Sequence, residues 1–108
     1  MNVVFRVDSS VTIGTGHVMR CLTLAKQLNQ RSINIFFMCR DLDGNLIDFI
    51  KNQHFTVYTL PKIELIQNYN NNPFVWYKEN WQKDASETLD IIKQQSFPID
   101  LLIIDHYG

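Results

Sequence analysis

The stretch Arg6-Val-Asp-Ser-Ser-Val-Thr-Ile-Gly-Thr-Gly-His-Val-Met-Arg20 joins the end of an apolar run to a polar loop with two glycines and then to a helical pattern. The run 3–7 has the length and composition of a buried parallel strand. Residues 17–30 repeat apolar side chains at helical spacing, so a helix is predicted to open on His17. Such a loop and helix start gather backbone N–H groups and partial positive charge, which suits a diphosphate.

Outward from this stretch, strand and helix patterns alternate along the chain. Further strands are predicted at 33–38, 55–60 and 100–104, and further helices at 43–51 and 81–95, with 64–80 irregular. This alternation predicts an α/β, Rossmann-like domain of three layers, with helices on both faces of a parallel sheet. The simplest strand order is 3-2-1-4.

In that order the first and fourth strands are neighbours, where the direction of winding reverses. Ligands of open α/β sheets bind at this position, outside the carboxyl ends of the strands. The first strand ends at Asp8, before the glycine loop, and the fourth ends at Asp105, His106 and Tyr107. We therefore expect two polar clusters that are far apart in sequence to face one crevice.

Composition excludes several classes of protein. The 108 residues suffice for one small domain, and 45% hydrophobic residues suffice for a core. A net charge of −1 argues against nucleic-acid binding. No apolar run approaches the ~18 residues of a membrane span, and no leader pattern is visible, so a cytoplasmic protein is expected. Cys21 and Cys39 have neither metal nor disulfide spacing and are expected to be core residues, and we predict no metal.

The glycine loop matches known phosphate-binding patterns only loosely. Gly14, Thr15 and Gly16 are not followed by the Gly-Lys-Ser/Thr of a P-loop, and Met19 stands where a dinucleotide fingerprint has its third glycine. The loop can bind phosphate or can be a tight turn without a ligand. The residues alone leave both interpretations open.

The start of the helix carries two further candidates. His17 can simply begin the helix, or it can act as a general base, since a helix N-terminus disfavours the imidazolium form. Arg20 lies one turn later on the same face. It can hold a phosphate or carboxylate, or it can be a solvated surface cation.

Other polar residues flank the two strand ends. Arg6 lies inside the first strand and needs a partner, and Asp8 on the same face is expected to form a structural ion pair that shapes the loop. At the end of the fourth strand, Tyr107 can hydrogen-bond a sugar or orient a water, while His106 can equally be a packed residue. Trp76 and Trp81 are expected to pack the irregular segment.

Three stretches and part of a predicted helix carry a resemblance to a known family. The first stretch is 5–25, which contains the glycine loop, and the likeness continues to Leu28. The second is Arg40 with the segment Gly44-Asn-Leu-Ile47. The third stretch is Leu101-Leu-Ile-Ile-Asp-His-Tyr-Gly108. Together they resemble the N-terminal domain of the UDP-sugar hydrolases of pseudaminic acid biosynthesis, and the helix around 81–88 adds to the likeness through Trp81, Asp84, Ala85 and Thr88.

This resemblance implies a fold and a reaction. The fold would be of the two-domain GT-B glycosyltransferase type, with 1–108 as an incomplete N-terminal domain that lacks the C-terminal UDP-binding domain. The reaction would release UDP from UDP-2,4-diacetamido-2,4,6-trideoxy-β-L-altropyranose, by attack of water on the anomeric carbon with inversion and without metal or other cofactor.

The resemblance also implies roles for residues at both strand ends. His17 would be the general base, and Tyr107 would lie near the catalytic water and the sugar. Gly14 and Gly16 would lie against the diphosphate and sugar. Substrate contacts are also expected from Thr15, Arg20, Asp105 and His106.

Two other functions remain open on the sequence. The chain can be the acceptor domain of a GT-B glycosyltransferase, in which His17 activates an acceptor hydroxyl instead of water. It can also be a non-catalytic interaction module that lends its crevice or its fourth strand to a partner. That strand would be an apolar, poorly covered edge, so we expect a missing domain or a partner chain to complete it. Without one we expect the chain to bind UDP weakly and to show little or no turnover.

Overall fold

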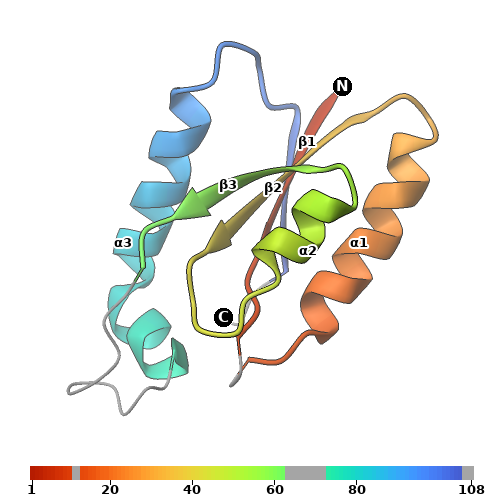
Figure 1. The fold of residues 1–108 in the computed structure, drawn as a ribbon. Coiled ribbons are helices and arrows are strands. Elements are labelled where there is room, and N and C mark those ends of the chain that lie inside the picture. The colour runs from red at the N-terminus through yellow and green to blue at the C-terminus, as the bar shows by residue number, and fades with distance from the viewer. Residues whose placement is uncertain (11–12, 63–72, 106–108) are drawn as a thin grey trace.

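The computed structural model describes residues 1–10, 13–62 and 73–105, which form a sheet between two layers of helices (Figure 1). The elements in chain order are β1 (Asn2–Val7), α1 (Gly16–Asn29), β2 (Asn34–Arg40), α2 (Ile47–Asn52), β3 (Thr56–Leu60), α3 (Pro73–Lys93) and β4 (Leu101–Asp105). All strand pairs are parallel, and the order is β3-β2-β1-β4. The predicted α/β class and strand order are confirmed.

Strand β1 is central to the fold. Its Phe5 is paired with Phe37 of β2 on one side and with Ile103 of β4 on the other. Helix α1 connects β1 to β2 and α2 connects β2 to β3, and both helices lie on one face of the sheet (Figure 1). The connection from β3 back across to β4 carries α3 on the opposite face, as right-handed crossovers require.

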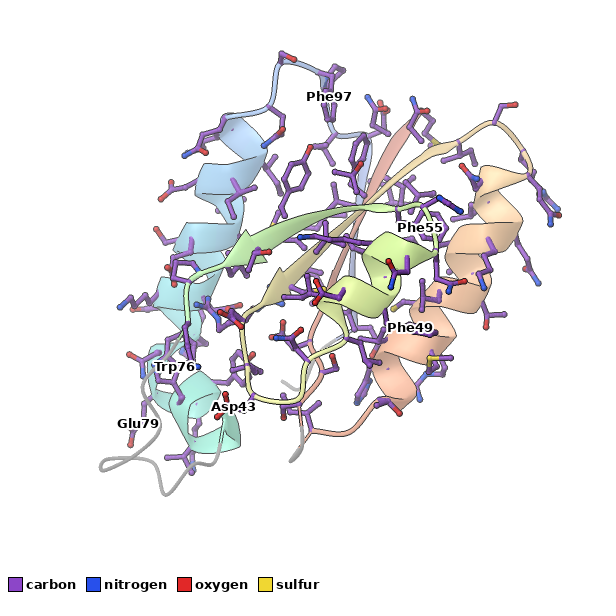
Figure 2. The ribbon with its side chains drawn as sticks, viewed as in Figure 1. Asp43, Phe49, Phe55, Trp76, Glu79 and Phe97 are labelled. Carbon is purple, nitrogen blue, oxygen red and sulfur yellow. The ribbon has the colours of Figure 1, made fainter. Side chains whose placement is uncertain are left out.

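The pleat of the strands sends alternate side chains into two cores. The core under α1 and α2 contains Val3, Phe5 and Phe37, which meet Val18 and Leu22 of α1. The core under α3 is smaller: Val4, Met38 and Leu60 are buried, and the partly buried Ile91, Ile92 and Leu102 pack against them. Near the amino ends of the strands, Phe97 stacks on Phe36 with ring centroids 4.9 Å apart (Figure 2).

Helix α3 contains the helix predicted from residue 81 but begins earlier, at Pro73. Its first part is set off by non-helical backbone angles at Asn80 (φ −124°, ψ 25°). Proline is favourable in a first helical turn, and Trp76 and Tyr77 bury themselves there against Leu42 of the β2–α2 connection. The asparagine-rich sequence before Pro73 is typical of a loop, so the local pattern does not predict a helix here. Packing against residues distant in sequence stabilises this part of α3.

The structure also describes the two tryptophans and the two cysteines. Trp76 is buried and lies near the carboxyl edge of the sheet (Figure 2), whereas Trp81 is 62% exposed. Cys21 and Cys39 are both buried, as free thiols. No helix in the described ranges is both long and apolar enough to span a membrane.

Candidate active site at the carboxyl edge of the sheet

In the described part of the loop between β1 and α1, Ser10 accepts two hydrogen bonds. The Gly14 N–H donates to the Ser10 carbonyl at 2.8 Å, and the Ile13 N–H donates to the Ser10 hydroxyl at 2.9 Å. Gly14 has φ +84°, a left-handed conformation that side chains with a Cβ rarely adopt. Thr15 caps α1 without a side-chain hydrogen bond to that helix. The amides of the first turn therefore depend on water or a ligand for part of their hydrogen bonding.

The two polar clusters meet as the strand order predicted. His17 Nδ1 at the start of α1 lies 2.7 Å from Asp105 Oδ1 at the end of β4. Arg20, one turn further along α1, places Nη2 2.8 Å from the same Nδ1 and 3.5 Å from Asp105 Oδ2. The side chain of Arg20 is 66% exposed, and those of His17 and Asp105 are each 27% exposed. The three groups form one cluster that solvent and a ligand can reach.

The proton on His17 can be assigned from its partners. An ionised carboxylate only accepts hydrogen bonds, so the close contact with Asp105 requires Nδ1–H to be the donor. Nδ1 cannot donate to Asp105 and accept from Arg20 at once, and we assign the bond to the carboxylate because it is charge-assisted. In the neutral ring, Nε2 is then the nitrogen that can accept a proton.

The electrostatics of Asp105 agree with this pairing. Partial burial alone would raise the pKa of Asp105, but the hydrogen bond from His17 and the nearby His17 and Arg20 charges together lower it below its ordinary value. The Cys21 thiol adds a weak contact, with Sγ 3.6 Å from Oδ2. Burial, then the Asp105 charge and hydrogen bond, raise the pKa of that thiol to about 12. Asp105 is therefore ionised at neutral pH, and the Cys21 thiol is protonated there.

The lowered pKa of Asp105 predicts a pH-dependent contribution to stability. A carboxyl group that ionises more readily in the folded chain stabilises it above the unfolded-state pKa, near 3.8, and loses this effect as pH falls through the lower folded-state value. We expect the difference in unfolding free energy between wild type and Asp105→Asn to shrink as pH falls from about 4 toward about 2. Urea unfolding measures this difference, and a value that stays the same over that interval would contradict the pairing.

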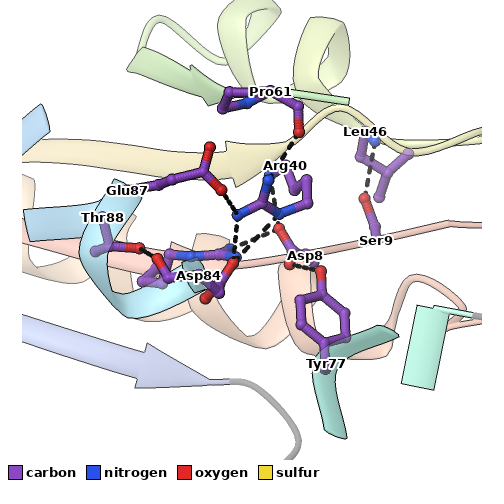
Figure 3. Close-up of polar contacts among 10 residues, drawn as sticks. Asp8, Ser9, Arg40, Leu46, Pro61, Tyr77, Asp84, Glu87 and Thr88 are labelled. Atoms are coloured by element: carbon purple, nitrogen blue, oxygen red, sulfur yellow. Dashed lines mark hydrogen bonds and ion pairs between the residues drawn. The ribbon is translucent and has the colours of Figure 1, made fainter. Parts of the chain in front are cut away.

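Beneath the loop, the predicted ion pair of Arg6 and Asp8 is present and buried. Arg6 Nη1 donates to Asp8 Oδ1 at 2.6 Å, and the backbone N–H of Arg40 donates to the same oxygen at 2.7 Å. The Tyr77 hydroxyl donates a short hydrogen bond to Asp8 Oδ2 (Figure 3). Asp8 thus joins β1, β2 and α3 immediately before the loop, and Ser9 next to it accepts from the Leu46 N–H at 2.9 Å.

Asp84 of α3 is the second centre of this network. Its Oδ1 accepts from Arg6 Nη2 at 2.7 Å and from Arg40 Nη2 at 2.6 Å (Figure 3). Arg40 also donates to the Pro61 carbonyl at 2.8 Å and to Glu87 at 3.1 Å. Burial alone would lower the pKa of Arg6, but the charges of Asp8 and Asp84 and the Asp8 hydrogen bond raise it, so the cation persists in the interior.

Sequence reasoning did not identify this wider network. Arg40, Asp84 and Thr88 drew attention only through the family resemblance, and Tyr77 was placed in an irregular segment. The one local signal was an arginine at the end of an apolar strand, which requires a buried acceptor. That acceptor comes from α3, 44 positions further along the chain.

The predicted residues His106 and Tyr107 lie outside the described residues, so their roles stay predictions. Within the described part of the chain, no group of His, Cys, Asp and Glu side chains is arranged to hold a metal ion.

The comparisons with known proteins agree with the predicted resemblance. No protein-family model matches the chain. Over all 108 residues it is 37% identical to the UDP-2,4-diacetamido-2,4,6-trideoxy-beta-L-altropyranose hydrolase of Campylobacter jejuni. The chain spans 29% of the length of that protein. This similarity supports a relation to that UDP-sugar hydrolase, through the part of it that the chain matches.

Proposed function

We propose that this chain supplies the proton-accepting part of a hydrolase that releases UDP from UDP-2,4-diacetamido-2,4,6-trideoxy-β-L-altropyranose. The observation that carries the proposal is the 2.7 Å contact between His17 and Asp105 at the switch point of the sheet. The similarity to a hydrolase of this substrate supports the reaction class. A neutral histidine oriented by a carboxylate is a general base suited to near-neutral pH.

In the proposed reaction, the oxygen of a water molecule bonds to C1 of the sugar while a proton of that water passes to His17 Nε2. The bond between C1 and the diphosphate oxygen breaks, and its electron pair leaves with UDP, so a single displacement inverts the anomeric carbon. Asp105 stabilises the imidazolium that forms. The N–H groups at the start of α1 and the exposed guanidinium of Arg20 would stabilise the charge that develops on the diphosphate.

The rest of the substrate requires more polypeptide under this proposal. The chain spans less than a third of the related hydrolase, so we place most of the uridine contacts on a second, C-terminal domain of GT-B type, or on a partner chain. Binding energy from the uridine would then position C1 over His17.

Because Cys21 and Cys39 are free thiols, a reducing cytoplasm suits the protein.

The test is UDP release from this nucleotide by the polypeptide that carries these residues, with the 108-residue chain assayed beside it. Release that needs only water, with an inverted sugar product, supports the proposal. Release that appears only after an acceptor alcohol is added would replace hydrolysis by glycosyl transfer. Binding of the nucleotide without any release of UDP would contradict a catalytic role for this site.

The Asp105→Asn variant tests the positioning of the base. We expect kcat to fall by about tenfold to a hundredfold with little change in KM, because the amide no longer stabilises the imidazolium that forms only during reaction. Asp105→Glu, which keeps the carboxylate, should retain more of kcat. Asp90→Asn on the exposed face of α3 is the matched control. Equal losses in Asp105→Asn and Asp105→Glu would point to a structural role instead.

A further inference from the structure

The first part of α3, residues 73–79, contacts the loop between β1 and α1. Trp76 and Tyr77 of this part are buried together with Leu42, and Ile13 of the loop packs against the same cluster. The two aromatic rings meet edge to face with centroids 5.4 Å apart, a geometry that adds to the stability gained from burial. The residue immediately before Gly14 is therefore supported by a packed aromatic pair.

A hydrogen bond joins the same part of α3 to the end of β1. The Tyr77 hydroxyl donates to Asp8 Oδ2 (Figure 3). Burial, followed by the charge of Asp8 and this hydrogen bond, raises the pKa of Tyr77 above its ordinary value, so the phenol stays protonated and remains a donor. Asp8 and Ile13 both precede Gly14, so two positions just before the start of α1 are attached to this part of α3.

The break in α3 accompanies these contacts. Asn80 departs from helical backbone angles, and its side-chain amide donates to the Trp76 carbonyl at 3.1 Å. Residues 73–79 can therefore pack against the loop, while Ile91 and Ile92 of the second part pack under the sheet. An interrupted helix loses backbone hydrogen bonds, so the contacts made by Trp76 and Tyr77 must offset that loss.

Tyr77 affects the orientation of Asp8 and not its charge compensation. Arg6 and the backbone N–H of Arg40 both donate to Oδ1, whereas Tyr77 donates to Oδ2. A phenol carries no charge, and the Arg6 guanidinium also pairs with Asp84. Loss of the Tyr77 hydroxyl would thus leave the buried ion pairs in place and remove one constraint on the rotation of the Asp8 carboxylate.

We propose that Tyr77 is a positioning residue, which fixes the turn from Gly14 to His17 through Asp8. The inference rests on the proposed function, which assigns diphosphate and base roles to the amides at the start of α1 and to His17. Asp105 holds the His17 ring from β4, at 2.7 Å, whereas Tyr77 acts on the backbone from which that ring projects. Small displacements of groups that act on a transition state are costly in rate.

The test is the Tyr77→Phe variant, which keeps the ring in its cluster and removes the hydroxyl. The Gly14 N–H, which donates to the Ser10 carbonyl at 2.8 Å, should exchange with solvent about tenfold faster in the 108-residue chain, as measured by NMR. In the polypeptide that releases UDP, kcat should fall by about tenfold while KM changes by less than about twofold. Ile13→Val, which trims the loop side of the contact, should change both quantities in the same direction.

Two matched controls separate positioning from stability. Tyr58→Phe removes a phenolic hydroxyl from β3, in the core under α3. Ile91→Ala removes packing from the second part of α3 and should lower the free energy of unfolding. Neither control should change the exchange of the Gly14 N–H or kcat.

Three results would overturn the inference. One is exchange of the Gly14 N–H at the same rate in Tyr77→Phe and Tyr58→Phe. Another is equal acceleration of exchange at Gly14 and at Phe37 in β2, which would give Tyr77 a role in global stability alone. The third is faster Gly14 exchange with the kcat of wild type. A wild type that releases no UDP would contradict the proposed function, and the exchange rates alone would then decide whether Tyr77 fixes the turn.

Discussion

Replacing His17 by Asn is expected to lower kcat for UDP release by about a hundredfold to ten-thousandfold, the usual contribution of a general base. Asparagine keeps a polar group of similar reach but cannot take up a proton at neutral pH. Nucleotide affinity should stay within a few-fold of wild type, because the proposed diphosphate contacts come from backbone amides and Arg20. Steady-state release of UDP, together with a binding titration, measures both effects.

His54→Asn is the matched control for that substitution. His54 lies after α2, away from the β1 and β4 ends, and has φ 70°. Asparagine tolerates this left-handed conformation better than most residues, so the control should fold and retain full activity. A His17→Asn enzyme with kcat near that of His54→Asn would exclude His17 as the base.

Replacing Asp84 by Ala is expected to lower the free energy of unfolding by about 3–5 kcal/mol. The substitution removes an acceptor shared by Arg6 and Arg40, which are 1% and 0% exposed. Two buried guanidinium groups then lack part of their negative partner charge. The cation–π contact of Arg40 with Trp76, whose ring centroid lies 4.7 Å from Cζ, cannot replace that carboxylate. Urea unfolding followed by circular dichroism measures the loss.

Asp90→Ala is the control on the same helix. Asp90 is exposed, so the substitution should change the free energy of unfolding by no more than about 0.5 kcal/mol. A loss below about 1 kcal/mol for Asp84→Ala would mean that Asp8 and Glu87 suffice to hold both arginines, and that the network does not depend on α3 through Asp84.

Much of the fold and the meeting of His17 with Asp105 could be predicted because local pattern and topology suffice for them. Strand and helix periodicity depends on the spacing of apolar residues close together in the sequence. The handedness of crossovers leaves few ways to order four parallel strands. Once β1 and β4 are neighbours, their carboxyl ends coincide. The pairing of Arg6 with Asp8 followed from two residues on one face of the same strand.

The sequence by itself thus determined the elements, the strand order and the edge at which polar residues gather. Only the tertiary structure decided that α3 begins at Pro73, that Asp84 pairs with the buried Arg6 and Arg40, and that Tyr77 donates to Asp8. These features rest on partners separated by up to 78 positions in the chain. No local periodicity encodes such a partner, because a buried charge requires only that some acceptor reach it, and packing selects which one does.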